Sequence, residues 1–228
     1  IELQLKDLET IESRYAKAEK AARTSGDRDS KLLFEILKRY KAALEQGKSA
    51  RTVEFESKEE IKMAKELCLL TSKPVLYVCN VDEASAKDGN AYTKQVEEAA
   101  KAEGAEMLIV AAKIESDIAE FESYEEKQLF LSELGLEQSG VARLIQAAYH
   151  LLDLQTFLTA GEQEVKAWTF TRGWKAPQCA GVIHSDFEKG FIRAEVIKYD
   201  DYVSLKSETA CKEAGKMSVE GKDYLVQD

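Results

Sequence analysis

The first 54 residues carry apolar side chains every three or four positions, in two runs. The recurring positions are Leu8, Ile11, Tyr15, Ala18 and Ala22, then Leu33, Ile36, Tyr40 and Ala43. This spacing predicts two helices. The polar residues 24–27 separate the helices, and Gly47 is a typical helix stop. A narrow apolar seam with charged flanks suits an antiparallel coiled coil, although two helices packed on a globular core would give the same pattern.

A different pattern follows between residues 73 and 115. The apolar run 75–79 is bounded by Pro74 and by polar residues, which predicts a buried strand. A helical pattern covers residues 91–102, and residues 107–110 form a second apolar run. Strand, helix and strand with a polar loop after each strand is the layout of a nucleotide-binding α/β domain.

The loop after the first predicted strand carries the best candidate chemistry. It reads Asn80-Val81-Asp82-Glu83. An Asn offers a donor and an acceptor, and a Glu three residues later offers acceptors, so the pair is able to read the edge of a purine base. The alternative interpretation is a simple turn, because Asn and Asp are common turn formers.

The last 75 residues are predicted to be rich in β-structure. Strand-like runs cover residues 165–171, 181–184, 191–196 and 224–226, and residues 200–205 and 209–214 suit short helices. Trp168 and Phe170 alternate and are expected to face the core. Trp174 lies in a predicted turn between Arg172 and Lys175, and is the better candidate for an exposed contact.

Composition predicts a globular protein of the cytoplasm. The 228 residues suffice for a real core, and no apolar run approaches membrane-spanning length. The four cysteines have no paired metal-binding spacing, which favours free thiols. His184 has no Cys or second His near it in sequence, so a structural role is favoured over a functional one.

Charge is distributed unevenly. The net charge is +2 for residues 1–54, −9 for residues 55–144 and −3 for residues 145–228, which gives −10 in total. A protein this acidic is not a general nucleic-acid binder. Contact with a phosphate surface is expected only locally, and the basic residues of the first segment are candidates for it, although a solvated face is an equal alternative. These residues are Arg14, Lys17, Lys20, Arg23, Arg28, Lys38 and Arg39.

Several longer motifs resemble one family closely. Besides NVDE at 80–83 and AAKIE at 111–115, they are SGVARLIQAAYHLL at 139–152, TFLTAGEQEVKAWTFTRG at 156–173 and APQCAGVIHSDFEKGFIRAEVIKYDDY at 176–202. Together they are similar to the YchF or Obg-like ATPases, a branch of the Obg-related P-loop NTPases. The resemblance covers essentially the whole chain.

The resemblance implies a preference for ATP over GTP. The usual guanine-reading pattern Asn-Lys-x-Asp becomes Asn-x-x-Glu here, with Val81 for Lys and Glu83 for Asp. A carboxylate accepts from the N1–H and amine of guanine but is repelled by the N1 lone pair of adenine, and the longer Glu spoils the fork to guanine. Asn80 would then bond the base, and the Val81 backbone would read its edge.

The same resemblance implies a second base-binding loop. Residues Ala111, Ala112 and Lys113 would close over the base, although the family more often has Ser at position 111. An Ala there loses little if a backbone N–H makes the bond.

The sequence contains no G-x-x-x-x-G-K-[ST] motif, which holds nucleotide phosphates in this class. Gly47-Lys48-Ser49 has Ala42 in place of the first Gly, and Gly215-Lys216 is followed by Met217. The magnesium-binding Asp motif of the family is also absent. The chain is therefore expected to be the carboxyl-terminal two-thirds of such a protein, without its last strand and without hydrolytic activity of its own. Magnesium and ATP, with weaker GTP, would act in the intact protein.

The predicted fold is a partial α/β nucleotide-binding domain with an inserted helical arm and a C-terminal β-grasp module of the TGS type. The boundaries are residues 1–54 for the arm, 55–152 for the nucleotide domain and 153–228 for the TGS domain. Two functions remain open. One is a regulatory ATPase of translation in which this chain supplies base recognition. The other is a non-catalytic module that binds the ribosome or another protein, with RNA contacted through the arm and the TGS domain.

Overall fold

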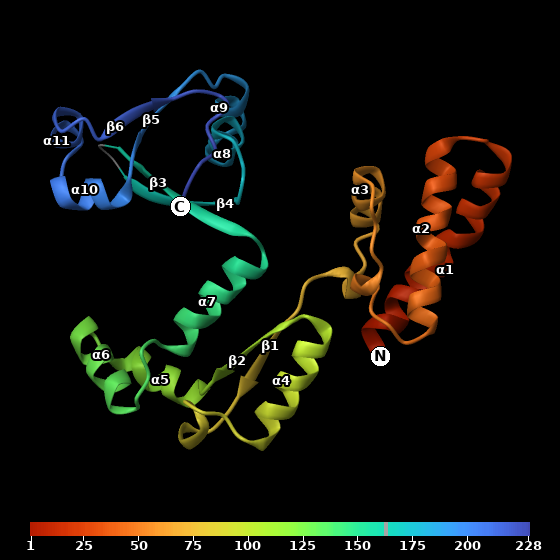
Figure 1. The fold of residues 1–228 in the computed structure, drawn as a ribbon, viewed down its shortest axis with the longest axis horizontal. Coiled ribbons are helices and arrows are strands. Elements are labelled where there is room, and N and C mark those ends of the chain that lie inside the picture. Colours follow the sequence, from red (N-terminus) through yellow and green to blue (C-terminus); the bar gives the residue numbers. More distant parts are fainter. Residues whose placement is uncertain (162–163) are drawn as a thin grey trace. The chain divides into compact units, whose positions relative to one another are not determined.

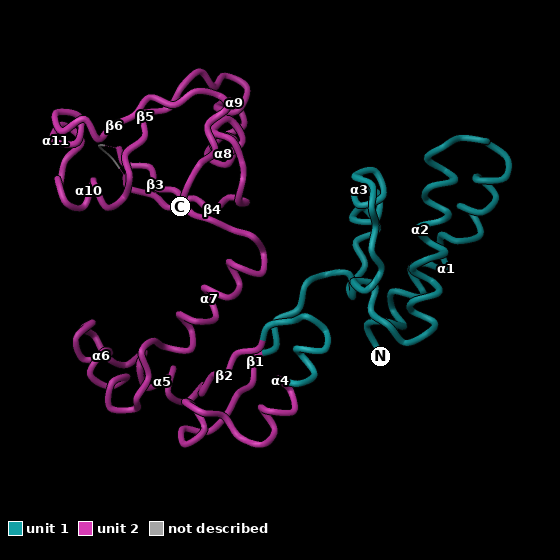
Figure 2. Tube along the Cα trace, in the orientation of Figure 1, with its two compact units in different colours: residues 1–77, 98–106 teal, residues 78–97, 107–228 magenta. Residues whose placement is uncertain are grey.

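The computed structural model describes residues 1–161 and 164–228, and it divides into two compact units. The first unit comprises residues 1–77 and 98–106, and the second comprises residues 78–97 and 107–228 (Figure 2). Figure 1 gives the labels of the helices and strands.

Helices α1 (Glu2–Thr24) and α2 (Arg28–Glu45) lie side by side in the first unit (Figure 1). Between them, Asp27 begins α2 by accepting a hydrogen bond from the Ser30 N–H at 3.0 Å. Gly47 follows α2 with φ of +72°, a backbone conformation that favours glycine. Both predicted helices, the break between them and the stop at Gly47 are confirmed.

The base of this helix pair belongs to a globular core. Ile11, Ile36 and Leu37 are fully buried in a cluster completed from the short helices η1 (Ala50–Thr52) and α3 (Lys58–Glu66) and from the segment before η2 (Leu70–Ser72). These elements contribute Ala50 and Ala64, and Leu69 precedes η2. Residues 23–29, at the other end of the pair, are exposed. The base thus packs on a core and the tip does not.

A buried carboxylate fixes the start of α1 to η2. Asp7 is 2% exposed, and its oxygens accept from the N–H of Leu70, the N–H of Thr71 and the Thr71 hydroxyl, each at 2.7 Å. A buried charge is costly unless it is hydrogen-bonded, and here three donors satisfy it. The segment that leads into the first strand is thereby tied to α1.

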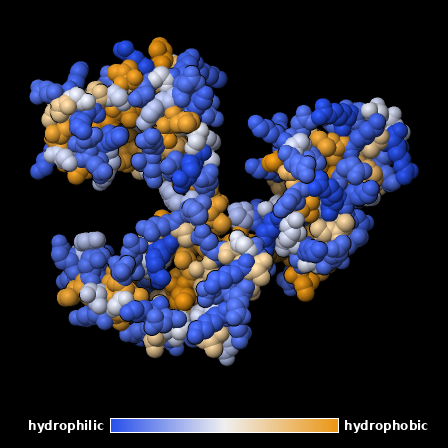
Figure 3. Space-filling model, in the orientation of Figure 1, coloured by the Kyte–Doolittle hydropathy of each residue, from blue (hydrophilic) through white to orange (hydrophobic). Residues whose placement is uncertain are grey.

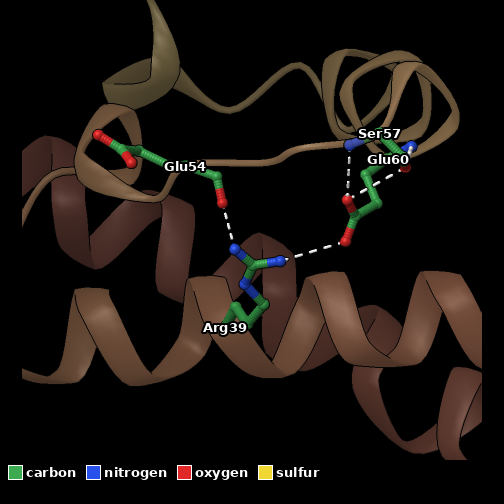
Figure 4. A network of polar contacts seen from close by, with 4 residues as sticks. All are labelled: Arg39, Glu54, Ser57 and Glu60. Carbon is green, nitrogen blue, oxygen red and sulfur yellow. Dashed lines mark hydrogen bonds and ion pairs between the residues drawn. The ribbon is translucent and has the colours of Figure 1, made fainter.

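A second polar network joins α2 to α3. The Arg39 guanidinium donates to the Glu54 carbonyl and lies 3.2 Å from the Glu60 carboxylate (Figure 4). It also stacks 4.6 Å from the centre of the Phe55 ring. Glu60 also closes a capping box with Ser57 at the start of α3. The hydrogen bond from the Ser57 N–H lowers the pKa of Glu60, so this carboxylate stays ionised at neutral pH.

Strands β1 (Leu76–Asn80) and β2 (Glu106–Val110) are hydrogen-bonded neighbours in a two-stranded sheet, and α4 (Ala91–Glu103) connects them. The predicted strand, helix and strand are confirmed, with β1 displaced by one residue from its prediction. The loop after β1 contains the short helix η3 (Glu83–Ser85).

Three further helices follow β2: α5 (Ala112–Glu120), α6 (Tyr124–Glu133) and α7 (Gly140–Leu151). Ile114 and Ile118 on α5 pack with Leu131 on α6 and with Ala86 and Ala111. This small core lies directly beneath the two loops that follow β1 and β2.

Strands β3 (Leu154–Ala160) and β4 (Val165–Thr171) form an antiparallel pair, with Leu154 opposite Thr171 and Ala160 opposite Val165. Phe170 is 2% exposed, and its ring centre lies 5.8 Å from that of Phe157. Strand 165–171 and the inward position of Phe170 are confirmed.

The strand predicted for residues 181–184 is wrong, because these residues end helix α8 (Ala176–Ile183) and begin α9 (Ser185–Lys189). The run Gly-Val-Ile looks strand-like alone, but Gln178 accepts from the Lys175 N–H at 3.0 Å and starts a helix before it. Gly181 suits this helix because it has no Cβ, and the Glu188 side chain occupies the space that a Cβ would need.

The remaining elements are β5 (Ala194–Ile197), α10 (Tyr199–Leu205), α11 (Glu208–Glu213) and β6 (Met217–Glu220). β5 and β6 pair antiparallel. Both predicted short helices are confirmed, β5 begins later than predicted, and β6 was not predicted. Of the predicted strand 224–226, only a single bridge between Leu225 and Lys175 forms.

Hydrophilic residues dominate the face drawn in Figure 3, with hydrophobic residues in small separate groups. None of the helices in the described residues combines the length and apolarity needed to cross a bilayer.

Candidate nucleotide-binding site

Asn80, the last residue of β1, holds the two candidate loops together. Its side-chain oxygen Oδ1 accepts a hydrogen bond from the N–H of Ala112, the first residue of α5, at 3.0 Å. Asn80 is exposed, and its amide nitrogen Nδ2 has no acceptor within residues 1–161 and 164–228. One end of the amide is therefore used by the protein, and the donor end remains for a ligand.

Of the two polar groups of the Val81 backbone, the N–H is already hydrogen-bonded and only the carbonyl is unpaired within the described residues. The N–H donates to the Val110 carbonyl at 2.9 Å, which extends the pairing of β1 and β2 by one residue. The N–H is therefore not available to read a base. The Val81 carbonyl receives no hydrogen bond from the part of the chain that the structure describes, so it remains as an acceptor for an exocyclic amine.

The two neighbouring carboxylates, Asp82 and Glu83, have different environments. Asp82 caps η3, because its Oδ1 accepts from the Ser85 N–H at 2.9 Å. Glu83 is exposed, and its carboxylate has no hydrogen bond or ion pair with any described residue. The Asp82 carboxylate is thus used within its own loop, and the Glu83 carboxylate is unpaired among the residues that the structure describes.

The second loop begins at Ala111, which is 5% exposed and stands at the N-cap of α5. Ala112 and Lys113 follow and are exposed. The group that bonds Asn80 is the Ala112 backbone N–H, so a hydroxyl at position 111 is not needed for that contact. These two hydrogen bonds, from Ala112 to Asn80 and from Val81 to Val110, place residues 80–81 beside residues 111–113.

Sequence reasoning missed the support behind these loops. The Glu115 carboxylate accepts from the N–H of Gly140 at 2.6 Å and of Val141 at 3.1 Å, at the start of α7. Arg143 donates through Nη2 to the Ile109 carbonyl of β2 at 2.8 Å. The Ser139-Gly140 pair in the sequence could have indicated this support, because it is typical of a helix start and helix N-termini attract carboxylates.

The seven basic candidates on α1 and α2 fall into three groups. Arg14, Lys17 and Lys20 are exposed, and no carboxylate of the described residues pairs with them. Arg28 and Arg39 pair instead with Glu59 and Glu60 of α3. Arg39 is exposed but also fixes α3 on α2, so a partner contact through it stays a prediction.

Two other candidates make weak pairs within their own helix. Arg23 lies 2.6 Å from Glu19 and Lys38 lies 3.8 Å from Glu35. Pairs of this kind on an exposed helix surface contribute little and leave the charge accessible.

The C-terminal candidates are partly engaged. Arg172 pairs with Asp153 at 2.9 Å and Lys175 with Asp223 at 2.6 Å. Trp174 is half-buried rather than exposed, and its backbone bonds Thr171 and Val226. Because the segment 224–226 lies against it, Trp174 is less exposed than expected, and a partner contact through it stays a prediction.

Trp168 is also half-buried, although the sequence suggested the core. Its indole N–H donates to the Thr159 hydroxyl at 2.9 Å, and Lys166 lies 4.0 Å above the ring.

His184 caps α9, because its Nδ1 accepts from the Asp186 N–H at 3.2 Å. The structural role favoured for it agrees with this contact. In the described part of the chain, no group of three or more His, Cys, Asp or Glu side chains is arranged to hold a metal ion.

Comparisons with known proteins agree on one family. The profile YchF-GTPase_C, described as "Protein of unknown function (DUF933)", matches residues 154–228. The chain is 53% identical over its whole length to the "Ribosome-binding ATPase YchF" of Bacillus subtilis, of which it covers 62%. It is 40% identical to "Obg-like ATPase 1" of Rattus norvegicus, of which it covers 58%.

A solved structure is similar over the whole fold. The "Structure of the Schizosaccharomyces pombe YchF GTPase" matches all of this chain with a TM-score of 0.85 and 31% identity, and the match covers 61% of that protein. The chain thus spans about three-fifths of the length of these relatives. From its mixed α/β fold and these similarities, the chain belongs to the YchF/Obg-like ATPase family.

Proposed function

We propose that this chain supplies base recognition to a regulatory nucleotide-binding protein of translation, and that it favours ATP over GTP. The observation that supports this most directly is the clasp between Asn80 Oδ1 and the Ala112 N–H, with the Glu83 carboxylate unpaired nearby in sequence. Relatives carry both names, ATPase for the Bacillus subtilis protein and GTPase for the Schizosaccharomyces pombe structure, so base preference is part of the proposal.

The available groups suit adenine. Asn80 Nδ2 donates to a ring nitrogen, and the Val81 carbonyl accepts from the exocyclic amine of adenine. Glu83 replaces the shorter carboxylate that would accept from both donors of guanine. Bound ATP would supply the phosphates and, with magnesium, the reactive centre. The residues described here account for the base, and no step at the phosphates is assigned to them.

The partner we propose is the ribosome, because bacterial relatives are named ribosome-binding ATPases. In this proposal α1 and α2 act as a coiled-coil arm and residues 153–228 as a TGS-type β-grasp domain. RNA contact through either of them would be local, given the net charge of −10.

A second candidate, a binding module without catalysis, is favoured by one observation. Arg14, Lys17 and Lys20 follow each other at intervals of three residues on α1 and are exposed. Such a basic face needs no nucleotide to bind a phosphate surface.

Base preference is tested in the complete gene product with the double substitution Val81→Lys and Glu83→Asp. Restoring a guanine fork adds charge-assisted hydrogen bonds, so the ATP-to-GTP affinity ratio should fall by about tenfold or more. Side-by-side titrations of the two nucleotides measure this ratio.

Glu98→Asp is the matched control. Like Glu83→Asp, it shortens an exposed Glu side chain, but Glu98 lies on α4, outside the candidate loops. That variant should keep the ratio of the unmodified protein. An unmodified protein that binds GTP more tightly than ATP would refute the proposed preference.

A further inference from the structure

The first turn of α7 contacts the base-binding loop on both sides. Upstream of the loop, Arg143 donates to the Ile109 carbonyl at 2.8 Å, one residue before the Val110 carbonyl that receives the Val81 N–H. Downstream, Glu115 accepts from the Gly140 and Val141 N–H groups. The loop of residues 111–113 is thus held between two contacts with one helix.

The contact at Glu115 is closely fitted. A Cβ at position 140 would lie 2.9 Å from Glu115 Oε1 and 2.9 Å from Val110 Cγ1, which is closer than packed atoms approach. Gly140 therefore lets the helix start come close enough for two short hydrogen bonds. Two N–H donors and a helix N-terminus together favour a carboxylate at this place.

Arg143 has no second partner for its Nε, which is buried and unbonded within the described residues. Its one hydrogen bond goes to the strand that carries the loop. A buried donor without a partner is costly, so the position of this side chain is not explained by stability alone.

We propose that Glu115 is a positioning residue for base recognition, with Arg143 as its counterpart at the end of β2. The inference rests on the proposed function and deepens it. Glu115 fixes the start of α5 against α7, which keeps the Ala112 N–H on Asn80 Oδ1. Asn80 then presents Nδ2 in one orientation. Loss of Glu115 would let the amide rotate and weaken recognition of the base.

The test compares Glu115→Ala with Ser139→Ala in the complete gene product. Ser139 caps the same helix through the Ala142 N–H at 3.1 Å and contacts neither loop, so both variants remove one cap from α7. Glu115→Gln keeps the volume and one acceptor, and serves as the conservative variant.

Two probes separate the base from the phosphates: ATP, and ribose 5-triphosphate, which lacks the base. Glu115→Ala should lower ATP affinity by about tenfold and leave ribose triphosphate affinity unchanged, with Glu115→Gln between it and the unmodified protein. Ser139→Ala should change neither. Hydrogen exchange supplies a readout without nucleotide: the Ala112 amide should lose protection in Glu115→Ala only.

The outcomes are distinguishable. If the unmodified protein binds ATP no more tightly than ribose triphosphate, base recognition itself fails, and the positioning role fails with it. If the unmodified protein discriminates but Glu115→Ala and Ser139→Ala behave alike in both assays, Glu115 is a helix cap only and the inference is overturned.

Discussion

Carboxylate side chains have different structural roles in this chain, even where they are adjacent in sequence. Asp82 and Glu83 are adjacent carboxylates, but Asp82 caps η3 and Glu83 is open. Asp7, another carboxylate, is buried and accepts three hydrogen bonds. Which role a carboxylate takes depends on the backbone N–H groups near it, since those groups need an acceptor once they leave the water.

The cysteines show a similar division. All four are free thiols; Cys179 and Cys211 are buried, and Cys68 is exposed. Burial raises the pKa of the Cys179 thiol from 9.0 to about 11. At pH 8 only about one such thiol in a thousand is a thiolate, the form that reacts with alkylating agents.

We therefore expect iodoacetamide at pH 8 to label Cys68 in the native protein and to leave Cys179 unmodified. Peptide mass spectrometry measures the sites, and labelling in denaturant shows that Cys179 is reactive once exposed. Native labelling of Cys179 as fast as that of Cys68 would contradict its burial.

The raised pKa also sets the sign of a pH effect. Because the unfolded thiol ionises first, the contribution of Cys179 to stability is complete below about pH 9 and falls as pH rises toward about 11.

At the scale of elements, short helices are fixed by side chains from elsewhere in the chain. α3 has only nine residues, and such a helix is marginal alone. Its capping box and the Arg39 network hold it on α2 (Figure 4). Arg39 thus contributes to the packing of the first unit.

Arg39→Met keeps an unbranched apolar stem and removes the guanidinium with its donors. We expect a loss of about 1–2 kcal/mol of unfolding free energy, from the Glu54 hydrogen bond and the Phe55 stacking. Chemical denaturation measures it, with faster hydrogen exchange in residues 54–60 as a second sign.

Arg28→Met is the matched control, because Arg28 pairs with Glu59 where both side chains are well exposed. Such a pair contributes less than about 1 kcal/mol. Equal losses in the two variants would show that the Arg39 network adds nothing beyond a surface pair.

For the molecule as a whole, charge limits how it would contact the ribosome that we propose as its partner. The net charge of −10 opposes unspecific binding to RNA, while the segment 1–54 carries +2. An electrostatic contact should therefore be confined to the exposed basic side chains of α1 and should weaken as salt rises.

The test replaces four basic residues of α1 by Gln in the complete gene product. Ribosome co-sedimentation should weaken by about tenfold near physiological salt, from a few tenths of a kcal/mol for each charge. Nucleotide affinity should be unchanged. The four residues are Arg14, Lys17, Lys20 and Arg23.

A control variant removes the same number of charges from the first unit outside α1, at Lys58, Lys62, Lys65 and Lys73. It should co-sediment like the unmodified protein. If the α1 variant also does so across a salt series, the arm is not an electrostatic contact and the C-terminal domain becomes the remaining candidate.

The elements whose pattern is local could be predicted from the sequence alone. The spacing of apolar residues defined α1, α2 and α4, and the runs at 75–79 and 107–110 defined β1 and β2. The sequence also selected Asn80, at the end of the first predicted strand, while the resemblance to the family added the loop that begins at Ala111. Periodicity and strand ends are properties of consecutive residues, so they are readable without a fold.

Which polar groups meet depends on the folded chain. The bonds from Asn80 to Ala112, from Glu115 to Gly140 and from Asp7 to Thr71 join residues 32, 25 and 64 positions apart. The same holds for the partners of Arg39, which come from residues 54–60. It also holds for residues 181–183, which have a strand-like composition but continue a helix that begins at Ala176. Local propensity is weak compared with such contacts, so the folded chain settles what the sequence pattern leaves open.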